Sequence, residues 1–108
     1  MGLVVAPILE DKLGDWKSWV AEFKGPEKGE FDEFNNRYGL TRHDIWLVES
    51  PDGPMAVVLH EGPGADAFMG KVMHSENGFD KTLTKHLSEF HGMDPNSPPP
   101  GPQPVKLL

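Results

Sequence analysis

Histidine is the residue of this sequence with the widest chemical use, and the chain has five: His43, His60, His74, His86 and His91. A metal site would require two or three of them at compatible spacing with a carboxylate. The chain contains no His-x-His pair and no His-Glu-x-x-His motif. We therefore expect no metal site and no cofactor, and a long-range site that uses His60 is the less favoured alternative.

His60 is the strongest single candidate for chemistry. It ends an apolar run, residues 55–61, and shares one face of that run with Ala56 and Val58. On a face that meets helices, its imidazole could act as a general base or hydrogen-bond a ligand. His86 would be its partner in moving a proton. The more common alternative is a strand-end histidine satisfied by ordinary partners.

Aromatic side chains are concentrated in the first half of the chain. Trp16, Tyr38 and Trp46 could line an apolar pocket, with an indole N–H or the phenol O–H as polar anchor. Most aromatic residues of a small domain are needed for its core. We therefore treat these three as candidate ligand-binding residues and expect the others to pack the interior.

A glycine-rich stretch at residues 62–67 matches the Gly-x-Gly-x-x-Ala spacing of a dinucleotide-binding loop. Pro63 removes one backbone amide from that loop, and Asp66 would place a negative charge beside a phosphate. These two conflicts favour an ordinary connection between a strand and a helix, with Asp66 as helix cap.

Composition excludes several further classes of function. The chain has 108 residues, a formal charge of -7 and no cysteine. The length allows one domain, residues 1–108, and the absence of cysteine excludes disulfides and thiolate chemistry. The negative charge has the wrong sign for binding a polyphosphate or an anionic membrane. We expect a cytoplasmic protein without a nucleic-acid or membrane partner.

The hydrophobic periodicity predicts the elements that must position these residues. Residues 3–9 are typical of a buried strand, and residues 13–38 of a helix that Gly25 and Pro26 divide into two. The runs 45–49 and 55–60 flank a Pro-Asp-Gly turn, which predicts a hairpin. Two further helical segments follow, and we expect Asp80 to cap the last one and Gly92 to end it.

The end of the chain has a composition of its own. Five prolines fall within residues 94–104, which indicates a stiff, extended connector. The apolar residues 105–108 follow it. We interpret them as a last strand or a docking arm, and a frayed terminus is the alternative.

The resulting βαββαβ order predicts an α+β fold of the ferredoxin-like type, in which helices cover one face of an antiparallel sheet. The two runs of the hairpin carry apolar residues on both of their faces. The uncovered face of the sheet would then form a large apolar patch. A second copy is the simplest cover, which predicts a homodimer.

Several of these features together resemble small uncharacterised bacterial proteins of the dimeric α+β barrel superfamily. The resemblance rests on the opening Val-Val-Ala-Pro-Ile-Leu, the Trp16/Trp19 helix, the strand with Trp46, the Pro-Asp-Gly turn and the Glu-Phe-His-Gly sequence before the prolines. It covers nearly the whole chain. It implies a ferredoxin-like protomer and a homodimeric α+β barrel, but no single activity, because members of that superfamily differ in function.

Three hypotheses for function remain at this level. The first is a homodimeric α+β barrel that binds a small apolar or aromatic molecule between helices and sheet. The second is a cofactor-free enzyme of the monooxygenase or isomerase kind that uses His60 and His86. The third is a structural or interaction module with a fully packed interior.

Overall fold

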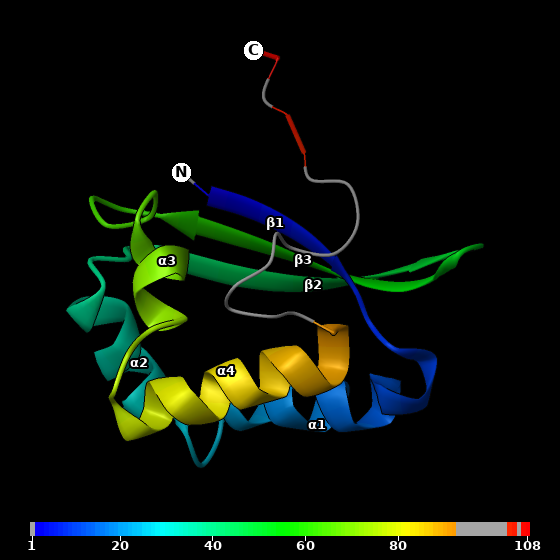
Figure 1. The fold of residues 1–108 in the computed structure, drawn as a ribbon, viewed down its shortest axis with the longest axis horizontal. Coiled ribbons are helices and arrows are strands. Elements are labelled where there is room, and N and C mark those ends of the chain that lie inside the picture. Colours follow the sequence, from blue (N-terminus) through cyan, green and yellow to red (C-terminus); the bar gives the residue numbers. More distant parts are fainter. Residues whose placement is uncertain (1, 93–103, 106) are drawn as a thin grey trace.

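The computed structural model describes residues 2–92, 104, 105, 107 and 108. Within them the chain forms an α+β fold, with an antiparallel sheet and helices on one of its faces (Figure 1). This confirms the predicted class. In chain order the elements are β1 (Gly2–Pro7), the 3-10 turn η1 (Glu10–Lys12), α1 (Leu13–Glu22), α2 (Lys28–Arg37), β2 (Arg42–Ser50), β3 (Gly53–Glu61), α3 (Phe68–Val72) and α4 (Gly78–His91).

The sheet has the strand order β1-β3-β2, and both pairings are antiparallel. The predicted hairpin is confirmed, because β2 ends at Ser50, β3 begins at Gly53, and Ser50 Oγ donates a hydrogen bond to Gly53 O at 2.7 Å. The register sets His43 opposite His60, and His60 opposite Gly2 on the other side. The central strand therefore carries His60 in the middle of the sheet.

Strand alternation gives the sheet two different faces. The inner face meets the helices and carries Val4, Ala6, His43, Ile45, Leu47, Ala56, Val58 and His60. The outer face carries Leu3, Trp46, Val48, Met55, Val57 and Leu59. Trp46 and Val48 are each 44% exposed. Among the described residues no helix lies over this outer face (Figure 1).

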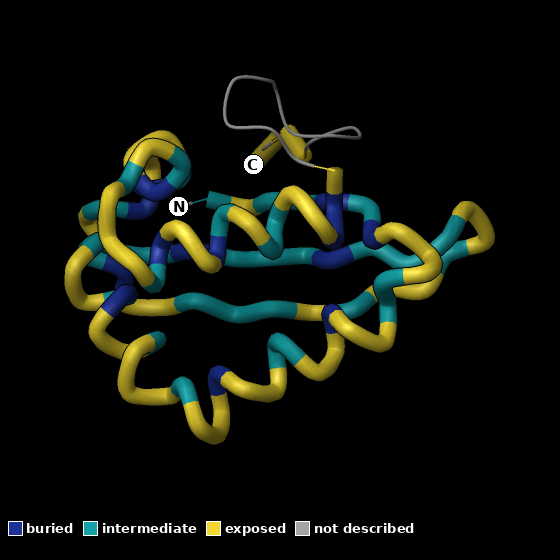
Figure 2. Tube along the Cα trace, turned by 60° about the horizontal axis from the view of Figure 1, so that its bottom comes forward, coloured by how far each residue is buried: buried dark blue, intermediate teal, exposed yellow. Residues whose placement is uncertain are grey.

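The core lies between the inner face and the helices, and buried positions of the helices lie on the sides that face the sheet (Figure 2). It has two buried clusters. One is centred on Phe34, Phe68 and Val72, and the other on Trp16 and Phe90. Trp19 of α1 packs against both clusters, and its large indole side chain therefore connects the two halves of the interior.

The ends of α4 agree in part with the sequence prediction. Gly92 ends the helix in the left-handed conformation, at a φ of 69° that glycine adopts without strain. The prediction that Asp80 caps this helix is wrong. Asn77 is the cap, and its Oδ1 accepts hydrogen bonds from the backbone N–H groups of Phe79 and Asp80.

The two glycines of the 62–67 loop have a packing explanation. A Cβ at Gly64 would lie 1.8 Å from Tyr38 O, and a Cβ at Gly62 would lie 2.3 Å from Gly39 O. The Gly64 amide is already bonded to Gly39 O at 3.2 Å. Glycine is needed here because this loop passes directly against the chain that leaves α2.

The predicted elements at the C-terminus have a mixed outcome. Residues 94–103 of the proposed connector lie outside the described residues. Val105, Leu107 and Leu108 belong to no strand and are 80%, 89% and 106% exposed. The described sheet therefore has three strands instead of the expected four, and the docking-arm alternative stays a prediction. No described helix is long and apolar enough to cross a membrane.

Candidate functional site

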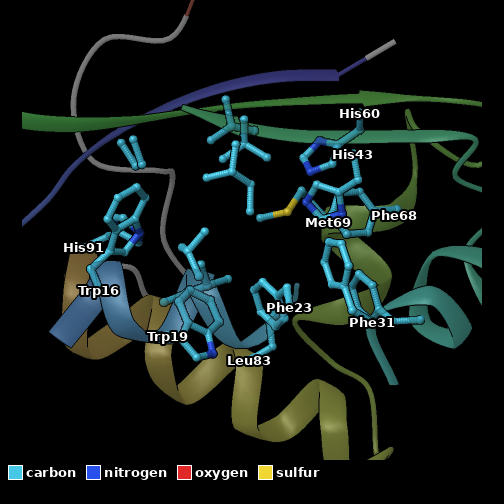
Figure 3. A pocket seen from close by; sticks show the side chains of 18 residues that line it. Trp16, Trp19, Phe23, Phe31, His43, His60, Phe68, Met69, Leu83 and His91 are labelled. Carbon is cyan, nitrogen blue, oxygen red and sulfur yellow. The ribbon is translucent and has the colours of Figure 1, made fainter. Parts of the chain in front are cut away.

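A cavity of about 70 Å³ lies between the inner face of the sheet and the helices (Figure 3). Its lining comes from all three strands and from α1, α2, α3 and α4. Most of the lining side chains are aliphatic or aromatic, and none is Asp, Glu, Lys or Arg. Three histidines supply its ionisable groups: His43, His60 and His91. The site is thus an apolar chamber with a few imidazole nitrogens, a composition typical of small-molecule pockets.

His43 and His60 are brought together by the register of β2 against β3. Both point to the inner face, where their ring centroids lie 4.6 Å apart in an edge-to-face arrangement. Phe68 of α3 packs against the second ring at 4.3 Å. His60 is only 2% exposed. This histidine pair forms one end of the cavity (Figure 3).

Both members of the pair are neutral in the folded protein near neutral pH. Burial lowers the pKa of His43 to about 4. Burial, and to a lesser degree the neighbouring His43, lower the pKa of His60 to about 3. A group with so low a pKa is a weak base at neutral pH but a good hydrogen-bonding group. The pair is therefore better suited to holding a ligand than to removing a proton from one.

The other end of the cavity is lined by Trp16 and His91 (Figure 3). His91 Nδ1 lies 2.8 Å from Pro7 O, and it must donate, because a carbonyl oxygen only accepts. Burial lowers the pKa of His91, and the bond to Pro7 partly opposes that shift. The bond ties the end of α4 to β1 and fixes the orientation of this ring.

A second hollow, along the free edge of β2, adjoins the cavity. The two share five lining residues: Val20, Phe23, Phe31, His43 and Ile45. Trp46, Asp44 and Lys24 line only the outer hollow. The side chains of these shared residues form the boundary between the two spaces.

The structure separates the residues that the sequence placed in one site. Trp16 and His60 line the cavity, at different ends, and Trp46 lines only the outer hollow. Tyr38 does not line the cavity, since its hydroxyl donates to Asp80. His86 does not line it either.

His86 lies in an aromatic stack instead. Its ring centroid is 5.1 Å from that of Trp19 and 5.2 Å from that of Phe90, with the Phe90 ring nearly parallel. Its Nδ1 is buried and has no hydrogen-bond partner. Glu89 Oε2 lies 3.7 Å from this nitrogen. The cavity that His60 lines therefore does not include His86.

The contributors to the cavity that sequence reasoning missed include His43, Met69 and His91. His43 had a usable signal, because it lies two residues before Ile45 and so shares the inner face with it. Met69 and His91 had no local signal. Their place in the lining depends on how α3 and α4 pack on the sheet.

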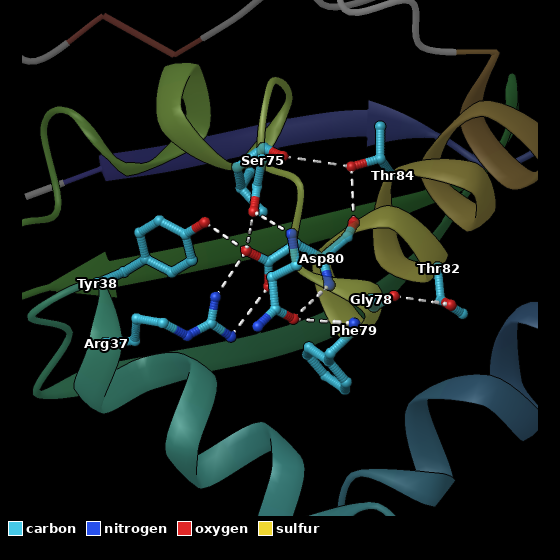
Figure 4. A network of polar contacts seen from close by, with 10 residues as sticks. Arg37, Tyr38, Ser75, Gly78, Phe79, Asp80, Thr82 and Thr84 are labelled. Carbon is cyan, nitrogen blue, oxygen red and sulfur yellow. Dashed lines mark hydrogen bonds and ion pairs between the residues drawn. The ribbon is translucent and has the colours of Figure 1, made fainter.

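A second polar cluster lies at the junction of α2 and α4 (Figure 4). Asp80 is fully buried and accepts hydrogen bonds from Arg37, Tyr38 and Ser75. The cluster does not line the cavity, and both oxygens of the Asp80 carboxylate already accept hydrogen bonds within it. Among the described residues no group of three His, Asp or Glu side chains could hold a metal ion.

Comparison of the chain with protein-family models, with curated proteins and with solved structures gives no match. The resemblance to the dimeric α+β barrel superfamily therefore stays a prediction.

Proposed function

We propose that the protein binds a small apolar molecule in the cavity between the helices and the sheet. The observation that carries this proposal is a chamber free of charged side chains, with neutral His43 and His60 at one end and a hollow at the β2 edge that shares its boundary. A packed core would leave no such space, because interiors of small domains are normally filled to the density of organic crystals.

The volume of the cavity limits the size of the ligand. A cavity of 150 Å³ accommodates benzene, whereas this one measures about 70 Å³. A ring-sized ligand therefore needs one lining side chain to move. Met69 of α3 is suited to that movement, since it is half-buried, unbranched and projects between the histidine pair and the helices (Figure 3). We propose that Met69 makes way for the ligand.

Binding is favoured over the cofactor-free enzyme hypothesis on three grounds. The pKa of His60, about 3, makes this residue a weak general base. His86, the partner named for proton transfer, packs between Trp19 and Phe90 away from the cavity. No second group in the cavity lining has the properties of a strong acid or base.

The binding proposal can be tested with toluene as probe and with two variants of neighbouring residues in β3. Val58→Phe fills the cavity from the inner face, and Val57→Phe adds the same ring on the outer face. We expect toluene to raise the melting temperature of the wild type and of Val57→Phe, but not of Val58→Phe. Absence of binding to the wild type, or equal binding to both variants, would contradict the proposal.

We also propose that the protein acts as a homodimer in which the outer faces of two sheets pack together. Strands about 4.8 Å apart and residues about 3.3 Å apart give this face an area of roughly 400 Å². The largest apolar patch on a monomer has about this size and is often functional. Its apolar residues include Trp46, Val48 and Leu3, each at least 40% exposed.

A sheet-on-sheet contact alone would bury roughly 800 Å² in total, less than the 1,200–2,000 Å² of typical stable complexes. The apolar side chains of Val105, Leu107 and Leu108 are the other large exposed hydrophobic group of the described chain. We therefore propose that residues 105–108 add to the same interface as a docking arm. This assigns both apolar surfaces to a single partner, a second copy of the chain.

A further inference from the structure

The hydrogen bond between His43 and Asn35 determines which nitrogen of the His43 ring carries the proton. His43 Nδ1 lies 2.9 Å from Asn35 Oδ1. An amide oxygen can only accept, so Nδ1 must donate. A neutral imidazole has one N–H group, and the second nitrogen, Nε2, is then an acceptor with a free lone pair.

No described residue donates a hydrogen bond to this acceptor. The ring of His60 packs edge-to-face against the ring of His43 with centroids 4.6 Å apart, and no hydrogen bond joins the two rings. The remaining ring neighbours are Phe31, Phe34 and Phe68, at centroid distances of 4.9, 6.3 and 6.2 Å. An acceptor held among aromatic rings on the boundary of the cavity favours a ligand that brings its own donor.

The charge of the ligand is constrained by the same lining. An anionic ligand would need a cation, and the lining has no Lys or Arg. Protonation of the pair would be costly, because burial holds the pKa of His43 at about 4 and that of His60 at about 3. A carboxylate would therefore lose its hydration without gaining a counter-charge.

We infer that the ligand is a neutral ring compound with a hydroxyl group, such as a phenol, and that this hydroxyl donates a hydrogen bond to His43 Nε2. This inference rests on the proposed function and adds the chemical class of the ligand. It makes His43 the residue that determines specificity, while the apolar lining contributes most of the contact with the ring.

The proton position can be measured directly on the free protein. In long-range ¹H–¹⁵N NMR spectra near neutral pH, we expect His43 to show a protonated Nδ1 and an unprotonated Nε2. The variant Asn35→Leu removes the acceptor and should weaken this tautomer preference. A wild-type ring protonated at Nε2 would overturn the inference without any use of a ligand.

Ligand selectivity supplies the second test. The probes are phenol, toluene and benzoate, and the variants are His43→Phe and, as matched control, the exposed His74→Phe. In His43→Phe we expect the affinity for phenol to fall about five-fold or more, the loss of one hydrogen bond. Toluene should bind this variant at least as well as the wild type, and benzoate should bind neither. His74→Phe should leave all three affinities unchanged.

The outcomes separate the two proposals. If neither toluene nor phenol binds the wild type, the proposed function fails. If both bind and His43→Phe weakens neither, or if benzoate binds as tightly as phenol, the cavity is a binding site but the assignment of a neutral hydroxyl ligand is wrong. The NMR measurement decides the tautomer even if the His43→Phe variant fails to fold.

Discussion

Arg37 and Asp80, 43 residues apart in the chain, form a two-pronged ion pair that joins α2 to α4. Nη1 lies 2.7 Å from Oδ2 and Nη2 lies 3.1 Å from Oδ1. Asp80 has no exposed surface, and Ser75 Oγ and the Tyr38 hydroxyl also donate to its carboxylate. Burial acts to raise the pKa of Asp80, but the bonds from Arg37, Ser75 and Tyr38 outweigh it and hold that pKa below its usual value.

This ion pair predicts a large loss of stability in the isosteric variant Asp80→Asn. The change leaves the guanidinium of Arg37 without its counter-charge in a largely buried site. Breaking a buried pair from one side costs about 3 kcal/mol in the free energy of unfolding, measurable by urea denaturation.

Asp32→Asn is the matched control for that variant. It removes the same charge from an ion pair with Lys28 whose side chains are 54% and 63% exposed. Exposed pairs of this kind contribute at most about 1 kcal/mol. Equal losses in the two variants would mean that the Asp80 cluster does not hold the helices together.

The histidine pair predicts a stability that falls in weak acid. The folded-state pKa values of His43 and His60, about 4 and about 3, lie below the ordinary value of 6.5, so the unfolded chain takes up protons first as pH falls. Their contribution is complete above about pH 6.5 and is lost as the pH approaches the folded-state values. At about pH 5 each of the two histidines should have lowered the free energy of unfolding by roughly 2 kcal/mol relative to neutral pH. Denaturant titrations at several pH values measure this loss.

The variant His43→Phe isolates the share of one histidine in that pH dependence. The slope of stability against pH between about 6.5 and 5 should fall but not vanish, because His43 no longer titrates while the buried His60 and His91, whose pKa values are also lowered, still do. His74→Phe removes an exposed histidine and should keep the wild-type slope. An unchanged slope in His43→Phe would show that acid destabilisation has another source.

Shortening the side chain of Met69 should strengthen the binding of a ligand in the cavity. Met69→Ala enlarges the cavity, so toluene should bind more tightly than to the wild type, while the free energy of unfolding falls by about 2 kcal/mol. Met73→Ala removes the same atoms from a residue that packs on the core but does not line the cavity. Titration calorimetry should therefore show a higher affinity for toluene only in Met69→Ala. A higher affinity in both variants would argue against Met69 as the side chain that moves when the ligand binds.

If two copies of the protein associate through the outer faces of their sheets, a single charged residue on that face should prevent the dimer from forming. Val48→Lys places a lysine on that face, and we expect sedimentation to show monomers where the wild type sediments as a dimer at micromolar concentration. Leu9→Lys is the control, because Leu9 is 43% exposed but lies outside the sheet. A wild-type protein that sediments as a monomer would refute the dimer, and truncation of residues 105–108 tests the arm in the same way.

Local patterns in the sequence predicted much of the fold correctly. The Ser50–Gly53 turn, the division near Gly25 and the stop at Gly92 follow from residue types that restrict the backbone over a few positions. The function of Asp80 could not be found this way. An aspartate near the start of a helix can be its N-cap or the partner of a buried cation, and the sequence around it looks the same in both cases. Only the packing of α2 against α4 shows that Asp80 is the partner of Arg37.

The sequence by itself predicted the order of strands and helices as far as the helix that Gly92 ends, the residues that share a strand face with His60, and the apolar character of both faces of the hairpin strands, because side-chain direction along a strand has a period of two residues. The tertiary structure alone decided that His43 stands beside His60, that Trp16 lines the other end of the cavity and that Tyr38, Trp46 and His86 do not line it. These positions depend on strand register and on helix packing, which bring together residues that are far apart in the sequence. Local residue patterns carry no information about such contacts.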